Sequence, residues 1–160
     1  MDFHEGDPVM HWTYGLGTVI RLEERNLSGS DMLYYAVQIN DMTVWVPADD
    51  NLESRLRRPT LKAKFMRMLK ILSDPGELLP LDRQERKLLL LELLKNGRVE
   101  SLCRVVRSLS AYRNTHPLNE ADQALLKRSQ NALLGEWGLA LSVTPVQAEI
   151  ELNRLLALTV

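Results

Sequence analysis

The sequence predicts an α+β protein of two domains, a small antiparallel β barrel followed by an all-helical domain of about five helices. Two observations predict this organisation. The apolar residues follow a period of two in the first part of the chain, and after Pro59 the period becomes about 3.6 residues. The sign of the charge changes at the same place: residues 1–58 hold five basic and ten acidic side chains (net −5), whereas residues 59–160 hold fifteen and eleven (net +4). We therefore expect domains at 1–58 and 59–160.

The first domain is expected to contain short strands, because stretches rich in Val, Ile, Thr, Tyr and Trp are bounded by turn residues. Gly15 and Gly17 stand where the second strand begins, which favours a tight bend or a close approach of two backbones. Residues 26–30 supply a hairpin loop and Asn40-Asp41 a tight turn, so neighbouring strands should pair antiparallel. The expected strands cover residues 8–12, 17–24, 33–40 and 43–46.

The second domain is expected to be helical because start and stop signals punctuate the 3.6-residue pattern. Asp82 with Glu85 and Thr144 with Gln147 have the spacing of capping boxes, Pro145 suits a first turn, and Asn119 can cap a long helix. The expected helices cover about residues 61–72, 83–95, 99–113, 120–141 and 146–158.

Motifs for catalysis and for metal or cofactor binding are missing from the sequence. Gly15-Leu16-Gly17 lacks the third glycine and the helix that a dinucleotide fingerprint requires. The three histidines and the single Cys103 are scattered, without metal-ligand spacing, and Cys103 fits a buried structural thiol. The adjacent acids Glu23-Glu24 and Asp49-Asp50 are interpreted as solvated charges. We therefore expect a protein that is not an enzyme and has no cofactor.

The chain has no apolar run of the roughly 20 residues that span a membrane, and its polar start lacks the features of a signal peptide. A cytoplasmic protein without membrane contact is expected.

The opening Phe3-His4-Glu5-Gly6-Asp7-Pro8-Val9 and the following Tyr14-Gly15-Leu16-Gly17-Thr18-Val19 resemble the N-terminal signature of the CarD/CdnL family of transcription regulators. The resemblance continues through Tyr34-Tyr35, Val44-Trp45-Val46-Pro47 and Leu56-Arg57, and then through residues 118–140, so that it covers nearly the whole chain. It implies a Tudor-like β barrel that docks on the β subunit of RNA polymerase. It also implies a helical domain that lies on double-stranded promoter DNA just upstream of the melted region.

The resemblance places two residues at the polymerase interface, Arg25 and Trp45. Arg25 follows Glu23-Glu24, so the alternative for it is a local surface ion pair worth at most about 1 kcal/mol. Trp45 alternates with Val44 and Val46 and faces away from them, which makes it an interface anchor if exposed and a core residue if buried.

On the DNA side, many members of the family carry a Trp that wedges into the edge of the melted DNA, and here Arg83 stands at that position. Arg86 matches a basic position of the family, and Lys87 extends the cluster. Arg104 and Arg107 could widen this DNA-binding patch, whereas Arg98 and Arg113 lie only at its ends. The alternative is that these are ordinary solvated helix residues. Two more apolar candidates for the wedge are Leu79 and Leu81, and Trp137 is expected in the core.

These observations predict a monomeric, nucleoid-associated regulator that binds RNA polymerase and promoter DNA and modulates the stability of the open complex. One alternative is a protein-protein adaptor that docks on polymerase without significant DNA binding, as the missing wedge Trp permits. The other is an enzyme whose site the sequence does not reveal.

Overall fold

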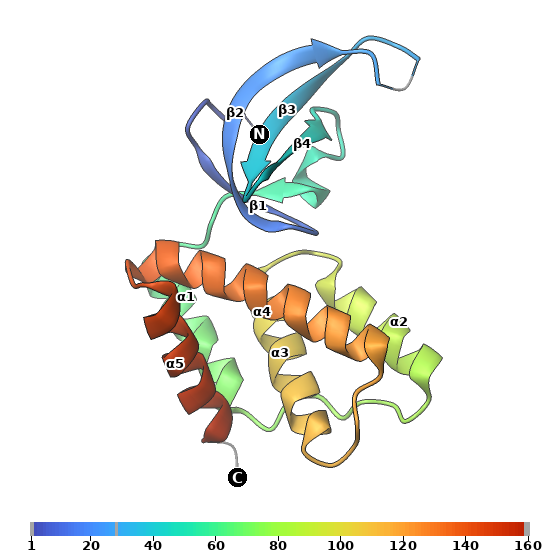
Figure 1. Ribbon diagram of the computed structural model, residues 1–160, viewed down its shortest axis with the longest axis vertical. Helices are drawn as coiled ribbons and strands as arrows, with labels where there is room; N and C mark the ends of the chain where they lie inside the picture. Colours follow the sequence, from blue (N-terminus) through green and yellow to red (C-terminus); the bar gives the residue numbers. More distant parts are fainter. Residues whose placement is uncertain (1, 28, 159–160) are drawn as a thin grey trace. The chain divides into compact units, whose positions relative to one another are not determined.

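The computed structural model describes residues 2–27 and 29–158, which divide into two compact units, one ending at Pro59 and one beginning at Thr60 (Figure 1). The first unit is a five-stranded antiparallel sheet and the second consists of helices. The expected fold class is confirmed.

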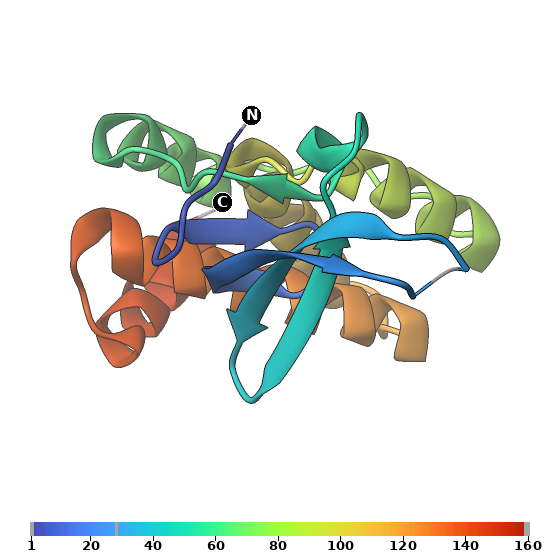
Figure 2. The ribbon, with the colours of Figure 1, turned by 90° about the horizontal axis from the view of Figure 1, so that it is seen from above.

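The sheet has the strand order β4-β3-β2-β1-β5, and every neighbouring pair is antiparallel. The order leaves β4 and β5 at the edges, and Figure 2 shows that the sheet is strongly curled. The short β5 was not expected, because two residues cannot show a period; it pairs with Met10 and His11. In the expected loop at 26–30, Ser28 lies outside the described residues. The strands are β1 Pro8–His11, β2 Gly15–Arg25, β3 Met32–Ile39, β4 Met42–Pro47 and β5 Leu56–Arg57.

Side chains that alternate along the strands fill the core of this unit. Val19, Val37 and Val46 come from three neighbouring strands and are almost completely buried. Gly17 faces Val9 across the β1–β2 pair, and a Cβ atom at Gly17 would lie 2.6 Å from Ile39 Cγ1 and 2.8 Å from the carbonyl oxygen of Gln38. The expected close approach at Gly17 is therefore present.

Replacing Gly17 by Ala should lower the free energy of unfolding by about 1–3 kcal/mol, because the new methyl group overpacks the contact with β3. Thr18→Ala, on the exposed side of the same strand, should cost less than about 1 kcal/mol. Equilibrium urea unfolding of the full chain, followed by tryptophan fluorescence, compares the two variants. Equal stability of both would contradict the steric explanation.

The helical unit is built around α3 (Val99–Arg113), of whose 15 residues ten are buried. Cys103 and Trp137 lie in its core, as expected, and the Trp137 ring packs edge-on against Phe65 at 5.9 Å between centroids. Burial, together with the nearby Glu136 and Glu100 carboxylates, raises the pKa of the Cys103 thiol to about 12, so this thiol is unreactive. The other elements are α1 Lys62–Met68, the 3-10 helix η2 Leu69–Ser73, α2 Arg83–Leu94, α4 Glu120–Leu141 and α5 Pro145–Ala157.

The caps lie where the sequence predicts them, although the capping box expected at the start of α2 is only half formed within the described residues. Asp82 accepts a hydrogen bond from the Glu85 backbone N–H, and the pairs Asn119–Asp122 and Thr144–Gln147 form complete capping boxes. The expected helix at 61–72 is instead α1 followed by η2, so its last turns are tighter than an α-helix. Within the described ranges, no helix is both long enough and apolar enough to cross a bilayer.

Candidate functional site

The β unit brings Arg25 and Trp45 together on the outer face of the sheet. The Arg25 guanidinium lies 4.4 Å from the centroid of the Trp45 ring, although the two residues belong to the non-adjacent strands β2 and β4. The intervening position on β3, opposite Trp45, is Ala36, and its small side chain lets the indole reach across the strand. The contact between Arg25 and Trp45 therefore depends on how β2, β3 and β4 are aligned with one another.

Glu23 holds this pair in place. Its carboxylate accepts a hydrogen bond of 2.5 Å from Trp45 Nε1 and one of 3.1 Å from Arg21 Nε, and it lies 3.6 Å from Arg25 Nη1. The Trp45 hydrogen bond, followed by the Arg21 hydrogen bond, lowers the pKa of Glu23 below its ordinary value of 4.5. We call these four residues, Arg21, Glu23, Arg25 and Trp45, the Trp45 face.

Arg25 and Trp45 both have local partners, and both remain partly exposed. Arg25 forms the local ion pair with Glu23, yet 38% of its side chain remains exposed. Trp45 is half-buried, so part of the indole is available to a partner while its N–H is satisfied internally. An oriented aromatic ring flanked by arginines has the composition of interface hot spots.

The Trp45 indole N–H should report the ionisation of Glu23. Because the folded-state pKa of Glu23 is depressed, the contact is present above the ordinary pKa of 4.5 and is lost as the pH falls through the lower folded value. The ¹⁵N–¹H resonance of the Trp45 indole should titrate with a midpoint below 4.5. In Glu23→Gln this titration should disappear; its persistence would show that another acid controls the ring.

In the helical unit, Arg86 is a core residue rather than a surface cation. Only 3% of it is exposed, and its Nε and Nη2 donate to the two carboxylate oxygens of Asp122 at 2.9 and 2.8 Å. Its Nη1 donates to the carbonyl oxygens of Pro80 and Leu81, and the guanidinium lies 4.8 Å from the centre of the Tyr112 ring. The hydrogen bonds to Asp122 raise the pKa of Arg86 above its ordinary value. The expectation that Arg86 contacts phosphate is corrected accordingly, because no surface of it is left for a ligand.

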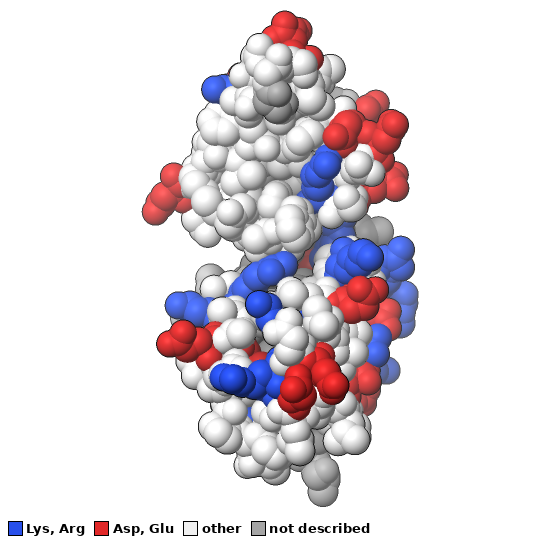
Figure 3. All heavy atoms as spheres, turned by 90° about the vertical axis from the view of Figure 1, so that its right-hand side faces the viewer, with Lys and Arg blue, Asp and Glu red and all other residues white. Residues whose placement is uncertain are grey.

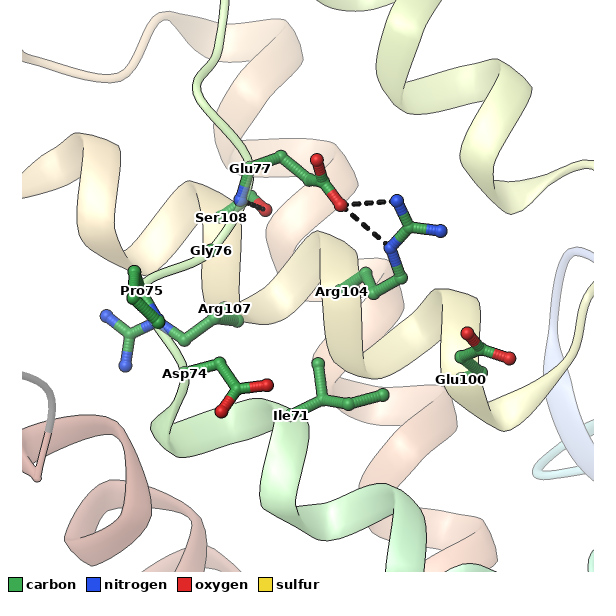
Figure 4. A pocket seen from close by; sticks show the side chains of 9 residues that line it. All are labelled: Ile71, Asp74, Pro75, Gly76, Glu77, Glu100, Arg104, Arg107 and Ser108. Atoms are coloured by element: carbon green, nitrogen blue, oxygen red, sulfur yellow. Dashed lines mark hydrogen bonds and ion pairs between the residues drawn. The ribbon is translucent and has the colours of Figure 1, made fainter.

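Arg104 and Arg107, which were expected to widen the DNA-binding patch, both have partners within the helical unit. Arg107 is 2% exposed, and its Nη1 donates to the carbonyl oxygens of Leu72 and Leu156 at 2.9 Å each, so the expectation that it lies on a DNA-binding surface is corrected. Arg104 forms an ion pair with Glu77 (Figure 4). Figure 4 also shows the two guanidinium groups pointing away from each other, although the residues are three apart on α3. The cleft that they line contains Asp74, Glu77 and Glu100 and is therefore not a site for anions.

Arg83 and Lys87 remain as exposed cations on the first two turns of α2, and neither side chain forms a hydrogen bond or ion pair within the described part of the chain. Of the apolar wedge candidates, Leu79 is buried, whereas Leu81 is 71% exposed just before the helix. On the face of the helical unit shown in Figure 3, Lys and Arg side chains are interspersed with Asp and Glu and do not form one uninterrupted basic patch.

The partners of the predicted residues were missed by the sequence analysis. Asp122 was not singled out, because no local pattern links it to Arg86, 36 residues away. Glu23 was interpreted as a solvated charge, because its contact with Trp45 depends on the register of three strands. Both contacts come from the tertiary fold, so an alternating or helical pattern carries no signal for them.

Arg86→Met should destabilise the helical unit by about 3–5 kcal/mol, because it leaves the buried Asp122 carboxylate without its countercharge. Arg83→Met, on the exposed side of the same helix, should change stability by no more than about 0.5 kcal/mol. Urea unfolding followed by far-UV circular dichroism measures both. Adding Asp122→Asn to Arg86→Met should recover part of the loss, and a double variant no more stable than the single one would argue against an unpaired charge.

Sequence comparisons match both units to one family. The profile described as CarD-like/TRCF RID domain matches residues 3–60, and the profile described as CarD, C-terminal domain matches residues 67–153. The chain is also 25% identical over 149 residues to a protein of Bacillus subtilis (strain 168) named "Putative transcription factor YdeB", a match that covers 91% of this chain and 96% of that protein.

Proposed function

The chain belongs to the CarD family of transcription-associated proteins, and from this premise we propose that it regulates transcription by binding the RNA polymerase β subunit and upstream promoter DNA. The family interacts with RNA polymerase. In this proposal the β unit supplies the polymerase contact and the helical unit the DNA contact. A location at the nucleoid would follow from the second contact.

The observation that carries the proposal is the Trp45 face. Arg25 stacks on the indole and Glu23 fixes both groups, so their geometry is set before any partner arrives. A side chain that is already ordered loses less conformational entropy on binding, which leaves more of the contact energy for affinity. A partly exposed Trp beside arginines also suits a partner surface with acidic groups.

The DNA contact rests on the exposed start of α2. Arg83 and Lys87 project from the end of a helix whose free backbone N–H groups and positive dipole end favour phosphate. Two such contacts give a slope of about −2 in a plot of log affinity against log salt concentration, so this binding is weak and depends on polymerase for its location. A regulator of this kind stabilises the open complex only by as much as it binds that state better than the closed one.

A second candidate function is the adaptor that docks on polymerase without significant DNA binding. The burial of Arg86 and Arg107 and the ion pair of Arg104 with Glu77 favour it, because they remove three of the five cations expected on the DNA side. Mobility shifts of forked and duplex promoter DNA separate the two candidates. Negligible binding by the wild type, unchanged in Arg83→Glu/Lys87→Glu, supports the adaptor.

Arg25→Glu in the full chain should abolish capture of the polymerase β lobe in a pull-down, because the new acid loses the stacking on Trp45 and repels Glu23. Trp45→Ala should weaken capture by at least about tenfold, the range of an interface anchor. Arg55→Glu, a matched charge reversal elsewhere in the β unit, is the control and should leave capture intact. Capture that survives both Arg25→Glu and Trp45→Ala would remove the Trp45 face from the polymerase contact.

A further inference from the structure

We infer that the outward face of α2 is a self-association surface, on which a second copy of this chain packs its own α2 side by side with the first and parallel to it. This face presents Leu88 and Leu91, which are 58% and 38% exposed, with Lys87 on one flank and Glu92 on the other. We call these four residues the α2 stripe. Figure 1 shows α2 at the margin of the helical unit, on the side away from α5.

The leucines of the α2 stripe lie on the side of the helix that faces away from the core. The buried residues of α2 recur every four positions and are Arg86, Leu90 and Leu94. Leu88 is two residues, or about 200° of rotation, from both Arg86 and Leu90. Leu91 follows Leu88 by three residues, so the two leucines are neighbours on the helix surface. A surface helix needs only one apolar face, and a second one on its solvent side therefore indicates a partner.

The charges beside the leucines select a second copy as the partner and a parallel arrangement. If Leu88 and Leu91 take the a and d positions of a seven-residue repeat, which form the seam of a coiled coil, Lys87 is at position g and Glu92 at position e. In a parallel pair, residue g of one helix faces residue e of the other, so Lys87 of each copy meets Glu92 of the second copy. An antiparallel pair would place each of these side chains opposite its own counterpart, where like charges repel.

Lys87 and Glu92 are available for such an interface. Neither side chain forms a hydrogen bond or ion pair within the described residues. Their separation of five residues places them on opposite flanks of the stripe, which prevents an ion pair between them within one helix. No acid stands three or four residues from Lys87 on α2, so the helix itself offers this lysine no partner. A second copy supplies one.

The stripe is short, so the pair is transient. The seam positions on either side of the leucines are the polar Gln84 and Lys95, which limit the seam to two apolar layers. α2 has 12 residues and is about 18 Å long, and an interface of this length falls below the roughly 1,200 Å² of stable complexes. Exposed ion pairs add little affinity but oppose wrong orientations, so the leucines hold the pair together and the charges orient it. Association is therefore expected at high local concentration, where it would also withdraw Lys87 from the proposed DNA contact.

Sedimentation velocity of the full chain at concentrations up to about 500 μM tests the surface. We expect the sedimentation coefficient of the wild type to rise with concentration, and Leu88→Gln/Leu91→Gln to lower the association constant at least about tenfold, because both apolar layers are lost. The control Val146→Gln/Ile150→Gln removes two apolar side chains of α5 that are 66% and 64% exposed, and it should associate like the wild type. Far-UV circular dichroism checks that each variant is folded. A wild type that stays monomeric, or a leucine variant that associates like the control, overturns the inference.

Two charge variants test the parallel arrangement without touching the leucines, so the surface stays testable if the leucine variant fails to fold. Lys87→Glu should weaken association about threefold or more at low salt, since it places two acids opposite each other on both sides of the pair. Adding Glu92→Lys to this variant exchanges the two charges and should restore the association of the wild type. Equal association of the wild type and Lys87→Glu, or no recovery in the double variant, overturns the parallel pairing.

Discussion

The ion pair between Arg86 and Asp122 is the constraint on which the helical unit depends, because two charges in the interior are stable only while each compensates the other. Two parallel hydrogen bonds from the Arg86 guanidinium to the Asp122 carboxylate join α2 to α4. The Nη1 group of Arg86 donates to the carbonyl oxygens of Pro80 and Leu81, just before α2. Removing one partner leaves a desolvated charge, so the pair fixes how these two helices approach. It also keeps Arg86 away from the surface.

The net charge of the helical part is therefore a poor guide to its surface. Two of its arginines, Arg86 and Arg107, are used inside to satisfy a carboxylate and main-chain carbonyl groups, and Arg104 is offset by Glu77. The exposed cations are spread over several helices. Lys62 and Lys64 lie on α1, Arg83 and Lys87 lie near the start of α2, and Arg113 and Lys127 line a cleft between α3 and α4. Under the proposed function, the DNA contact would therefore involve only a few phosphates.

The Trp45 face follows the same physical logic on the sheet. The Glu23 carboxylate accepts hydrogen bonds from the Trp45 indole N–H and from Arg21. These bonds fix the Trp45 ring, which could otherwise adopt several rotamers. In the buried case the acid stabilises the fold, whereas on the sheet it orients a half-buried ring at the surface. Both cases use one acid to orient a larger side chain from a distant part of the chain.

The sequence alone determined the fold class, the strands and helices longer than a few residues, and their caps, because these depend on residues that are close together in the chain. It also determined the family, through the motifs around Gly6-Asp7 and Gly15-Leu16-Gly17. Only the tertiary structure decided that Arg86 and Arg107 are buried, that Glu23 orients Trp45, and that Arg113 and Lys127 share a cleft. A helical period shows that Arg86 and Lys87 point in different directions, but not which of these directions meets an acid 36 residues further along the chain.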